Sequence, residues 1–380
     1  MHRSHGRTTL LGALSLLTFA CGASPLAPSA VSSASGSAVS GFGSSLASGP
    51  AAGSATGDAV SSPLEMRALT GRVTNLLTGA PASGVTVSIQ DLGAAAADAA
   101  GQFTLESEAP DGRYRATAAG PGVVSRQTSL TFPGQGAALS LIPNTFNMAA
   151  FDQMVRHFGD PDGATKRWMQ APALVIETAL VDPQSIDAAG IPQYPPVASA
   201  DQLSEASINE LVTHLTRALP LMTAGNFPTF SSIGRSTTAA GTPIEMDRPG
   251  TITVVRYRGL DTLCRGYTFF LYDTVSLEAS NARLFMQTCT DAPTSAAPMS
   301  AVVAHELGHA LGYGHVSLLP SVMAATVTSD VTEFDRQAAA IVFQRPPGNR
   351  APDADPDTFT VNQPARASLP RIPATVGPVP

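Results

Sequence analysis

The run HELGHALGYGH, which begins at His305, limits what this chain can fold into more than any other part of the sequence. Residues four apart lie on the same face of a helix, so His305 and His309 can direct ring nitrogens at one metal ion. Glu306 follows the first of them and can reach a water on that ion. Gly312 is expected to end the helix, because glycine adopts the left-handed conformation that a chain reversal requires. The reversal returns His315 as a third ligand, and three neutral imidazoles leave the open position that catalytic zinc needs.

Downstream of this run, a methionine and a short acidic stretch extend the pattern. Met323 lies eight residues after the third histidine, and the stretch EFDR at residues 333–336 opens an apolar helix. Together these residues resemble the metzincin zinc metallopeptidases, and the matrixins in particular. The resemblance implies a turn that places Met323 beneath the zinc histidines, and an extended peptide substrate paired with an edge strand, for which residues 267–272 are our choice. It also implies hydrolysis of peptide bonds by a zinc-bound water that Glu306 activates.

The chain departs from the metzincin patterns at two points. Ala325 stands where astacins place a tyrosine that helps to bind the oxyanion, so that help is absent. Matrixins usually carry a second, structural zinc held by further histidines. Outside the motif and the first residues of the chain, only His157 and His214 remain. We therefore expect one catalytic zinc and no second one.

The first residues are typical of an export signal. Two arginines precede an apolar run of 11 residues, Leu10 to Ala20, which is too short to span a bilayer. The sequence LTFACG around Cys21 resembles a bacterial lipoprotein signal, which implies cleavage before a lipid-carrying cysteine; ordinary cleavage after a nearby alanine is the alternative. Residues 1–21 form the predicted signal, and the Ala-, Ser- and Gly-rich residues 22–65 a disordered linker. We expect an exported protein, lipid-anchored at the cell surface or else secreted or periplasmic.

Charge and apolar runs limit the kinds of partner that the chain can bind, and the cysteines limit its possible disulfides. Only 13% of the residues are charged and the formal net charge is −7, with no basic stripe, which argues against nucleic acid as a partner. No later segment approaches 18 uninterrupted apolar residues, so a membrane contact is expected only through the lipid. In an oxidising environment, Cys264 and Cys289 are the one candidate disulfide pair, and two buried free thiols are the alternative.

Residues 66–143 are predicted to form an all-β domain. Short, roughly alternating apolar runs recur at intervals of about ten residues, between turns rich in Gly and Pro. The order of glycine turns and β-rich runs, including GQFTL and GRY, resembles the carboxypeptidase regulatory-like domain family. The resemblance implies a seven-stranded, prealbumin-like sandwich without catalytic residues, with Phe103 and Tyr114 in its core.

Residues 144–345 are predicted to form the metzincin-like catalytic domain, a mixed sheet with an active-site helix and a C-terminal helix, so the fold class is α+β. Apolar residues at helical spacing predict a helix within 203–219, and another is expected near Pro298. The last helix is expected to end at Phe343, with Thr332 as its N-cap. Pro, Asp, Asn and Ala dominate residues 346–380, which we expect to be a disordered tail. β-rich runs predict strands at residues 173–180, 251–257, 267–272 and 283–289.

Two other functions are compatible with the same sequence. The sandwich could serve adhesion or assembly at the cell surface beside a vestigial peptidase fold. The intact Glu306 counts against this, because a degenerate site loses its base early. Alternatively, the zinc site could hydrolyse a non-peptide amide. We expect a zinc endopeptidase, with peptides or proteins as substrates and zinc as its cofactor.

Overall fold

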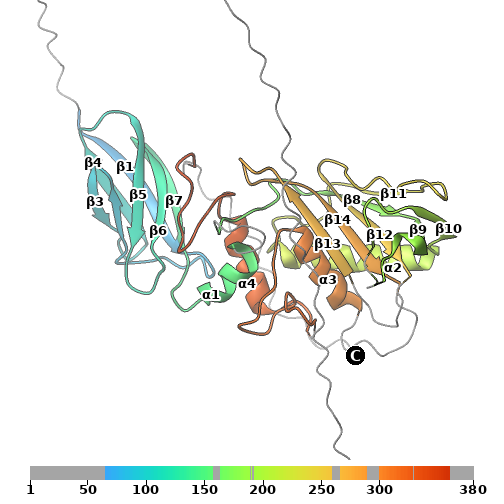
Figure 1. The fold of residues 1–380 in the computed structure, drawn as a ribbon. Helices are drawn as coiled ribbons and strands as arrows, with labels where there is room; N and C mark the ends of the chain where they lie inside the picture. The colour runs from blue at the N-terminus through green and yellow to red at the C-terminus, as the bar shows by residue number, and fades with distance from the viewer. Residues whose placement is uncertain are drawn as a thin grey trace, which may run out of the picture.

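The computed structural model describes residues 65–156, 163–188, 190, 192–258, 266–288, 299–327 and 329–359. They form an N-terminal all-β domain and a second domain that combines a seven-stranded sheet with helices (Figure 1). The predicted signal and linker up to residue 64, and the chain from residue 360 onward, lie outside the described residues. Cys21, Cys264 and Cys289 lie outside them as well, so the lipid and the disulfide stay predictions. Within the described ranges, no helix is both long and apolar enough for a bilayer crossing.

Seven strands form the N-terminal domain as two packed sheets. The sheets have the strand orders β4-β1-β7 and β3-β2-β5-β6. Only the pair β1–β7 is parallel among the strand pairs described there. The seven-stranded sandwich predicted from the sequence is confirmed. Its strands are β1 (Arg67–Asn75), β2 (Thr86–Ile89), β3 (Gly93–Ala96), β4 (Gln102–Ser107), β5 (Gly112–Ala119), β6 (Arg126–Phe132) and β7 (Gly134–Leu141).

Buried and exposed residues alternate along the strands, and this explains how the two sheets of the sandwich pack together. In β4, Phe103 and Leu105 are buried while the residues between and beside them are exposed. Successive side chains of a strand point to opposite faces, so the inward set of both sheets meets in one core. Phe103 lies in that core, as predicted. Tyr114 is partly buried against it, with its ring edge-on to Phe132 and the ring centroids 6.3 Å apart.

In the sheet of the second domain, five strands lie in the order β10-β9-β12-β14-β13. β8 also pairs with β12, and β11 pairs with β8. β12 is parallel to β8 and β14, whereas β13 is antiparallel to β14 and ends the sheet. All seven residues of β12 are buried, as in a strand covered on both faces. The strands are β8 (Ala173–Glu177), β9 (Ala179–Val181), β10 (Ala198–Gln202), β11 (Ile233–Ser236), β12 (Thr251–Tyr257), β13 (Gly266–Tyr272) and β14 (Ala279–Gln287).

The helices of the second domain pack on this sheet and on each other. α3 contacts β13, β14 and α2, and α4 contacts α2 (Figure 1). α2 buries Ile208, Leu211 and Leu215 at the predicted helical spacing. Thr332 caps α4 as predicted, in a capping box where its hydroxyl and the Asp335 carboxylate each accept from the other residue's N–H. The helices are α1 (Met148–Phe151), α2 (Glu205–Met222), α3 (Met299–Ala310) and α4 (Glu333–Phe343), with a π-helical turn η1 (Asp152–Arg156) and a 3₁₀ turn η2 (Pro183–Ser185).

The predicted disordered tail begins too early. Residues 346–359 instead return from α4 to the sandwich, and Asp353 among them is fully buried. Arg345 donates to Asp353 at 2.7 Å, and Arg126 of β6 donates to Asp355 at 2.7 Å. The prediction failed because this segment has no apolar periodicity. Buried ion pairs to arginines elsewhere in the chain hold it in place.

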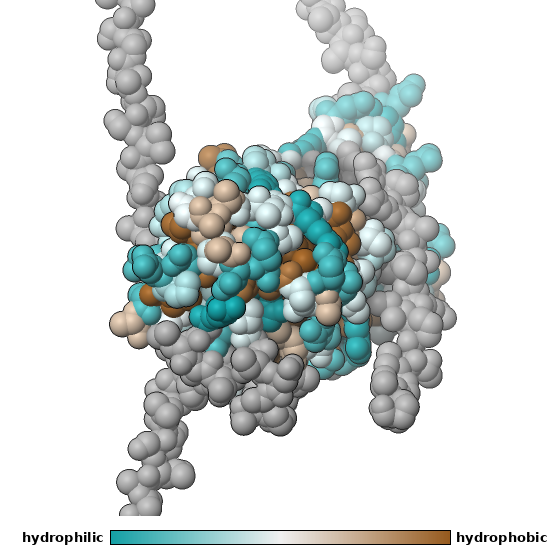
Figure 2. Space-filling view, turned by 90° about the vertical axis from the view of Figure 1, so that its right-hand side faces the viewer, coloured by the Kyte–Doolittle hydropathy of each residue, from teal (hydrophilic) through white to brown (hydrophobic). Residues whose placement is uncertain are grey.

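The side of the molecule that carries β9 to β11 is shown in Figure 2. Hydrophobic residues occur on this face as separate patches between hydrophilic ones. Two large apolar side chains with substantial exposure, Tyr194 and Ile233, belong to different segments of the second domain. Single exposed apolar residues are normal on a folded surface and need no partner to explain them.

Candidate active site

Three imidazole rings converge at the C-terminal end of α3. His305 and His309 lie one turn apart on the helix, and His315 follows the chain reversal. The Nε2 atom of His309 lies 3.0 Å from Nε2 of His305 and 3.1 Å from Nε2 of His315. The first two rings are buried and the third is partly buried. The structure thus brings together the three ligands predicted from the sequence.

The spacing of these nitrogens fits one small cation. Zinc–imidazole bonds are about 2.0–2.1 Å long, so tetrahedral geometry separates ligand nitrogens by about 3.3 Å. The two closest nitrogen pairs here, at 3.0 and 3.1 Å, are near that separation. One atom from each ring lies within 4.8 Å of the others. This donor set could therefore hold a metal ion.

Backbone carbonyls orient two of the rings. Nδ1 of His305 lies 2.7 Å from the Val322 oxygen, and Nδ1 of His309 lies 2.6 Å from the Tyr313 oxygen. A carbonyl can only accept, so each Nδ1 carries the proton and each Nε2 keeps its lone pair for an ion. Burial lowers the pKa of His305 to about 4, and it also lowers the pKa values of His309 and His315. All three rings are neutral at pH 7, as metal ligands must be.

The reversal after α3 depends on Gly312. This glycine has a φ of +97°, in the region that the sequence predicted for it. A Cβ atom there would also lie 3.0 Å from the Lys166 carbonyl oxygen and 3.0 Å from the Phe270 ring. Both the backbone conformation and the close packing therefore require glycine. The resulting turn brings His315 back to His305 and His309.

A tight turn beneath the histidines is held by Asp335. Met323 in this turn is fully buried against Gly308, where a Cβ atom would lie 2.3 Å from the Met323 sulfur. The buried Asp335 carboxylate accepts hydrogen bonds from a serine hydroxyl in the turn and from the Val322 N–H at 3.0 Å. The Val322 carbonyl in turn accepts from His305, so Asp335 fixes the turn that orients the His305 ring. The sequence indicated Asp335 only as part of a helix start, and this role was missed.

Glu306, which follows His305 in α3, is buried. Its exposed fraction is 2%, and Thr268 Oγ1 donates to its Oε2 at 2.6 Å. Burial raises the pKa of Glu306 to about 7, while the hydrogen bond from Thr268 acts to lower it. A divalent cation beside it would further favour the ionised carboxylate. Sequence reasoning missed Thr268, because its contact with Glu306 arises only when β13 packs on α3.

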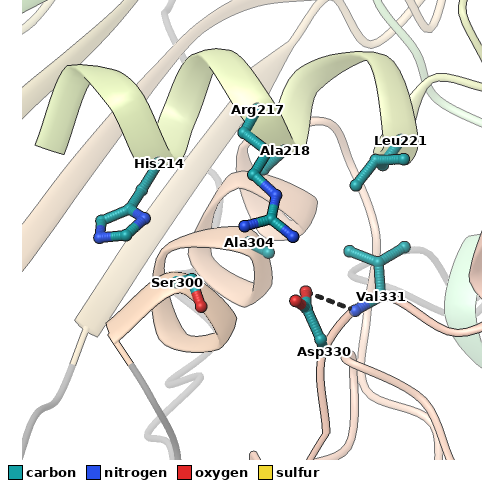
Figure 3. A pocket seen from close by; sticks show the side chains of 8 residues that line it. All are labelled: His214, Arg217, Ala218, Leu221, Ser300, Ala304, Asp330 and Val331. Carbon is teal, nitrogen blue, oxygen red and sulfur yellow. Dashed lines mark hydrogen bonds between the residues drawn. The ribbon is translucent and has the colours of Figure 1, made fainter. Parts of the chain in front are cut away.

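His214 is not part of the three-histidine cluster. It lines a small hollow between α2 and α3, together with residues of the loop before α4 (Figure 3). Arg217 and Asp330 point into this hollow from opposite sides. Asp330 already accepts a hydrogen bond from the Val331 N–H at 2.8 Å. We assign no ligand to this hollow.

The chain carries a carboxypeptidase regulatory-like domain, because residues 68–141 match the profile of that family. The match coincides with strands β1 to β7 and confirms the resemblance seen in the sequence. It covers less than half of the chain, so it identifies the sandwich and not the second domain. No curated protein matches the chain.

Three solved structures show partial likeness to the chain. The DUF3823 family protein from Parabacteroides merdae is 20% identical, over 20% of this chain and less than half (46%) of its own length, with a TM-score of 0.18. The 5-hydroxyisourate hydrolase from Klebsiella pneumoniae is 25% identical, over 19% of this chain and 84% of its own, with a TM-score of 0.16. Metalloproteinase-II from Bacteroides fragilis is 11% identical, over 73% of this chain and 86% of its own, with a TM-score of 0.26. At these TM-scores none of them bears on the chemistry of the chain.

Proposed function

We propose that this chain is a zinc-dependent endopeptidase of the metzincin type. The observation that carries the proposal is the convergence of three neutral imidazoles, two of them oriented by backbone carbonyls, with the buried carboxylate of Glu306 next to His305 in the sequence. His305, His309 and His315 would hold the ion through their Nε2 atoms. A set of three histidines with one open position suits catalytic zinc.

The chemistry divides between the ion and Glu306. Zinc at this site would supply a Lewis acid for the scissile carbonyl and lower the pKa of a bound water towards about 7. Glu306 accepts the proton of the attacking water, since burial raises its pKa to about 7 and Thr268 engages only one of its oxygens. The same carboxyl group then delivers this proton to the leaving amine.

The strand that packs next to Glu306 suits an extended peptide as the substrate. β13 ends the sheet and packs on α3, so its backbone runs past Glu306. A peptide that adds to a sheet edge gains main-chain hydrogen bonds without needing particular side chains. We therefore infer a peptide or protein substrate bound alongside β13.

We also propose that the protein acts outside the cytoplasm. This part of the proposal rests on the signal-like residues 1–21. Cys21 would carry lipid that holds the protein at the cell surface, with residues 22–65 as the tether; secretion or a periplasmic location is the alternative. Cys264 and Cys289 would then meet conditions in which a disulfide persists.

The test of the proposed function is Glu306→Gln, which removes the base and keeps the three ligands. We expect near-stoichiometric zinc by elemental analysis and a loss of peptide hydrolysis on the order of 10² to 10⁴-fold. His309→Ala should lose much of the zinc along with the activity. The matched control is Glu210→Gln on α2, where the side chain is 59% exposed, and it should change neither zinc content nor activity.

A peptide library digested by the purified protein, with the new N-termini read by mass spectrometry, supplies the substrate for these assays. Hydrolysis by Glu306→Gln at close to the parent rate would refute the mechanism. Close to two zinc ions per chain would contradict the single site. A parent that cleaves small non-peptide amides and no peptide would favour the alternative hydrolase, and a parent that binds no metal would favour adhesion by the sandwich.

A further inference from the structure

The hydroxyl of Thr268 lies against the side chain that we propose as the base. Thr268 Oγ1 is 2.6 Å from Glu306 Oε2 and 3.2 Å from the main-chain oxygen of Glu306. An ionised carboxylate can only accept, so the hydroxyl donates to it. The carboxylate is almost fully buried, and a hydrogen bond to a buried charge is stronger than one to a neutral group.

A second residue of the same strand shapes the space for Glu306. A Cβ atom at Gly266 would lie 2.3 Å from both Cγ and Cδ of Glu306. The Glu306 side chain therefore passes directly against the backbone of β13, where only glycine leaves room. Gly266 and Thr268 are two residues apart on a strand, so they present the same face to α3. Gly266 leaves room for the Glu306 side chain, and Thr268 supplies the hydrogen-bond donor.

We propose that Thr268 is a positioning residue for Glu306. Its hydroxyl holds Oε2, and Oε1, which lies against Gly266, would then face the water that attacks the substrate. This inference rests on the proposed function and extends it to the strand beside which the peptide would lie. β13 then serves both partners of the reaction: its backbone aligns the substrate, and its Thr268 aligns the base.

The alternative is that Thr268 only satisfies a buried polar group. A structural hydrogen bond of that kind would affect stability, whereas a positioning role requires an effect on turnover at unchanged substrate binding. Thr268→Val removes the donor and keeps the shape, and Thr268→Ser keeps the donor. The matched control is Thr253→Val on β12 of the same sheet, because the buried Thr253 hydroxyl makes no hydrogen bond in the described part of the chain.

The kinetic test uses a fluorogenic version of the peptide that the parent cleaves fastest in the library. We expect kcat of Thr268→Val to fall about tenfold to a hundredfold, the size of effect given by a hydrogen bond to a charged group. KM should stay within about twofold and zinc content should be unchanged. Thr268→Ser should recover kcat to within about threefold of the parent, and Thr253→Val should match the parent. A kcat for Thr268→Val within about twofold of the parent would overturn the proposal.

A second readout does not depend on turnover. The zinc-loaded protein is produced with glutamate labelled with ¹³C at the side-chain carboxyl and observed by NMR. The resonance that disappears in Glu306→Gln is assigned to Glu306. Thr268→Val should move this resonance, and Thr253→Val should leave it in place. An unmoved resonance in Thr268→Val overturns the proposal whether or not the parent is a peptidase. If the parent cleaves nothing and the resonance moves, the proposed function fails while the contact between Thr268 and Glu306 stands.

Discussion

The ion pair of Arg345 and Asp353 holds the C-terminal segment where the two domains meet. The two guanidinium–carboxylate hydrogen bonds are each 2.7 Å long, and the side chains are 1% and 0% exposed. The same guanidinium donates to the carbonyl of Ser140 in β7 of the sandwich, at 2.9 Å. Asp353→Asn keeps the shape of the side chain and removes its charge, so Arg345 is left buried without an anion in this pair.

The expected cost follows from this burial. Removal of one partner from a buried ion pair typically destabilises by about 3–5 kcal/mol, because the other charge stays out of water. An asparagine retains one acceptor, so we expect the lower end, about 3 kcal/mol, for Asp353→Asn. The matched control is Asp357→Asn in the same segment. Asp357 pairs with Arg115, but their side chains are 80% and 52% exposed, and exposed pairs contribute about 1 kcal/mol or less.

The single tryptophan of the chain provides the assay. Trp168 is buried in the second domain and donates to the Ala310 carbonyl at the end of α3, at 2.8 Å. Its fluorescence during urea denaturation therefore follows unfolding of the domain that holds the candidate active site. If Asp353→Asn lowers the free energy of unfolding no more than Asp357→Asn does, the reasoning about the buried pair is wrong.

The ion pair of Arg345 and Asp353 also predicts how the stability of the protein changes at low pH. Burial alone would raise the pKa of Asp353. The charge of Arg345, its hydrogen bond to the carboxylate, the charge of Arg126 and the hydrogen bond from Asn349 together outweigh burial and hold the pKa below its usual value. A lowered native pKa means that the stabilisation is present above the unfolded-state pKa of about 3.9 and is lost as the pH falls through the native value. The difference in stability between the parent and Asp353→Asn should therefore shrink below about pH 4. A difference that stays constant down to acid unfolding would contradict this assignment.

Two further predictions concern the metal and the cell surface. Asp335→Asn should weaken zinc binding by about tenfold to a hundredfold, because it disturbs the turn whose carbonyl orients His305; competition with a chromophoric chelator measures this, and parent-like affinity would refute it. Cys21→Ser should move the protein from the membrane fraction to the soluble fraction, and unchanged membrane association would refute the lipid anchor.

The candidate ligands could be predicted because they lie within eleven consecutive residues. Helix geometry relates His305 to His309, and the backbone freedom of Gly312 allows the reversal that follows. Neither step needs knowledge of the rest of the fold. The strand predicted at 251–257 agrees with β12 for a similar reason, since β-branched residues fill it.

The rest of the site depends on contacts between distant parts of the chain. Thr268 meets Glu306 across 38 positions of sequence, and no local pattern around Thr268 points to a carboxylate. The C-terminal segment was still harder to predict from local patterns, because Asp355 pairs with Arg126 across 229 positions of sequence. Composition made that segment resemble a tail, because the free energy that holds it comes from charges and not from an apolar face.

The C-terminal segment is also linked by hydrogen bonds to the loop that carries His315, through the turn η1. Arg156 in this turn donates to Asn349 Oδ1 at 2.7 Å, and Asn349 donates to Asp353 at 3.0 Å. Gln153 in the same turn accepts from the backbone N–H two positions after His315, at 3.0 Å. Loosening the segment should therefore loosen the loop that carries His315, so Asp353→Asn should weaken the proposed zinc binding as well as stability. Coupling of this kind is reciprocal, and zinc should in turn restore part of the lost stability. If Asp353→Asn loses stability and keeps the zinc affinity of the parent, the segment joins the domains without reaching the site.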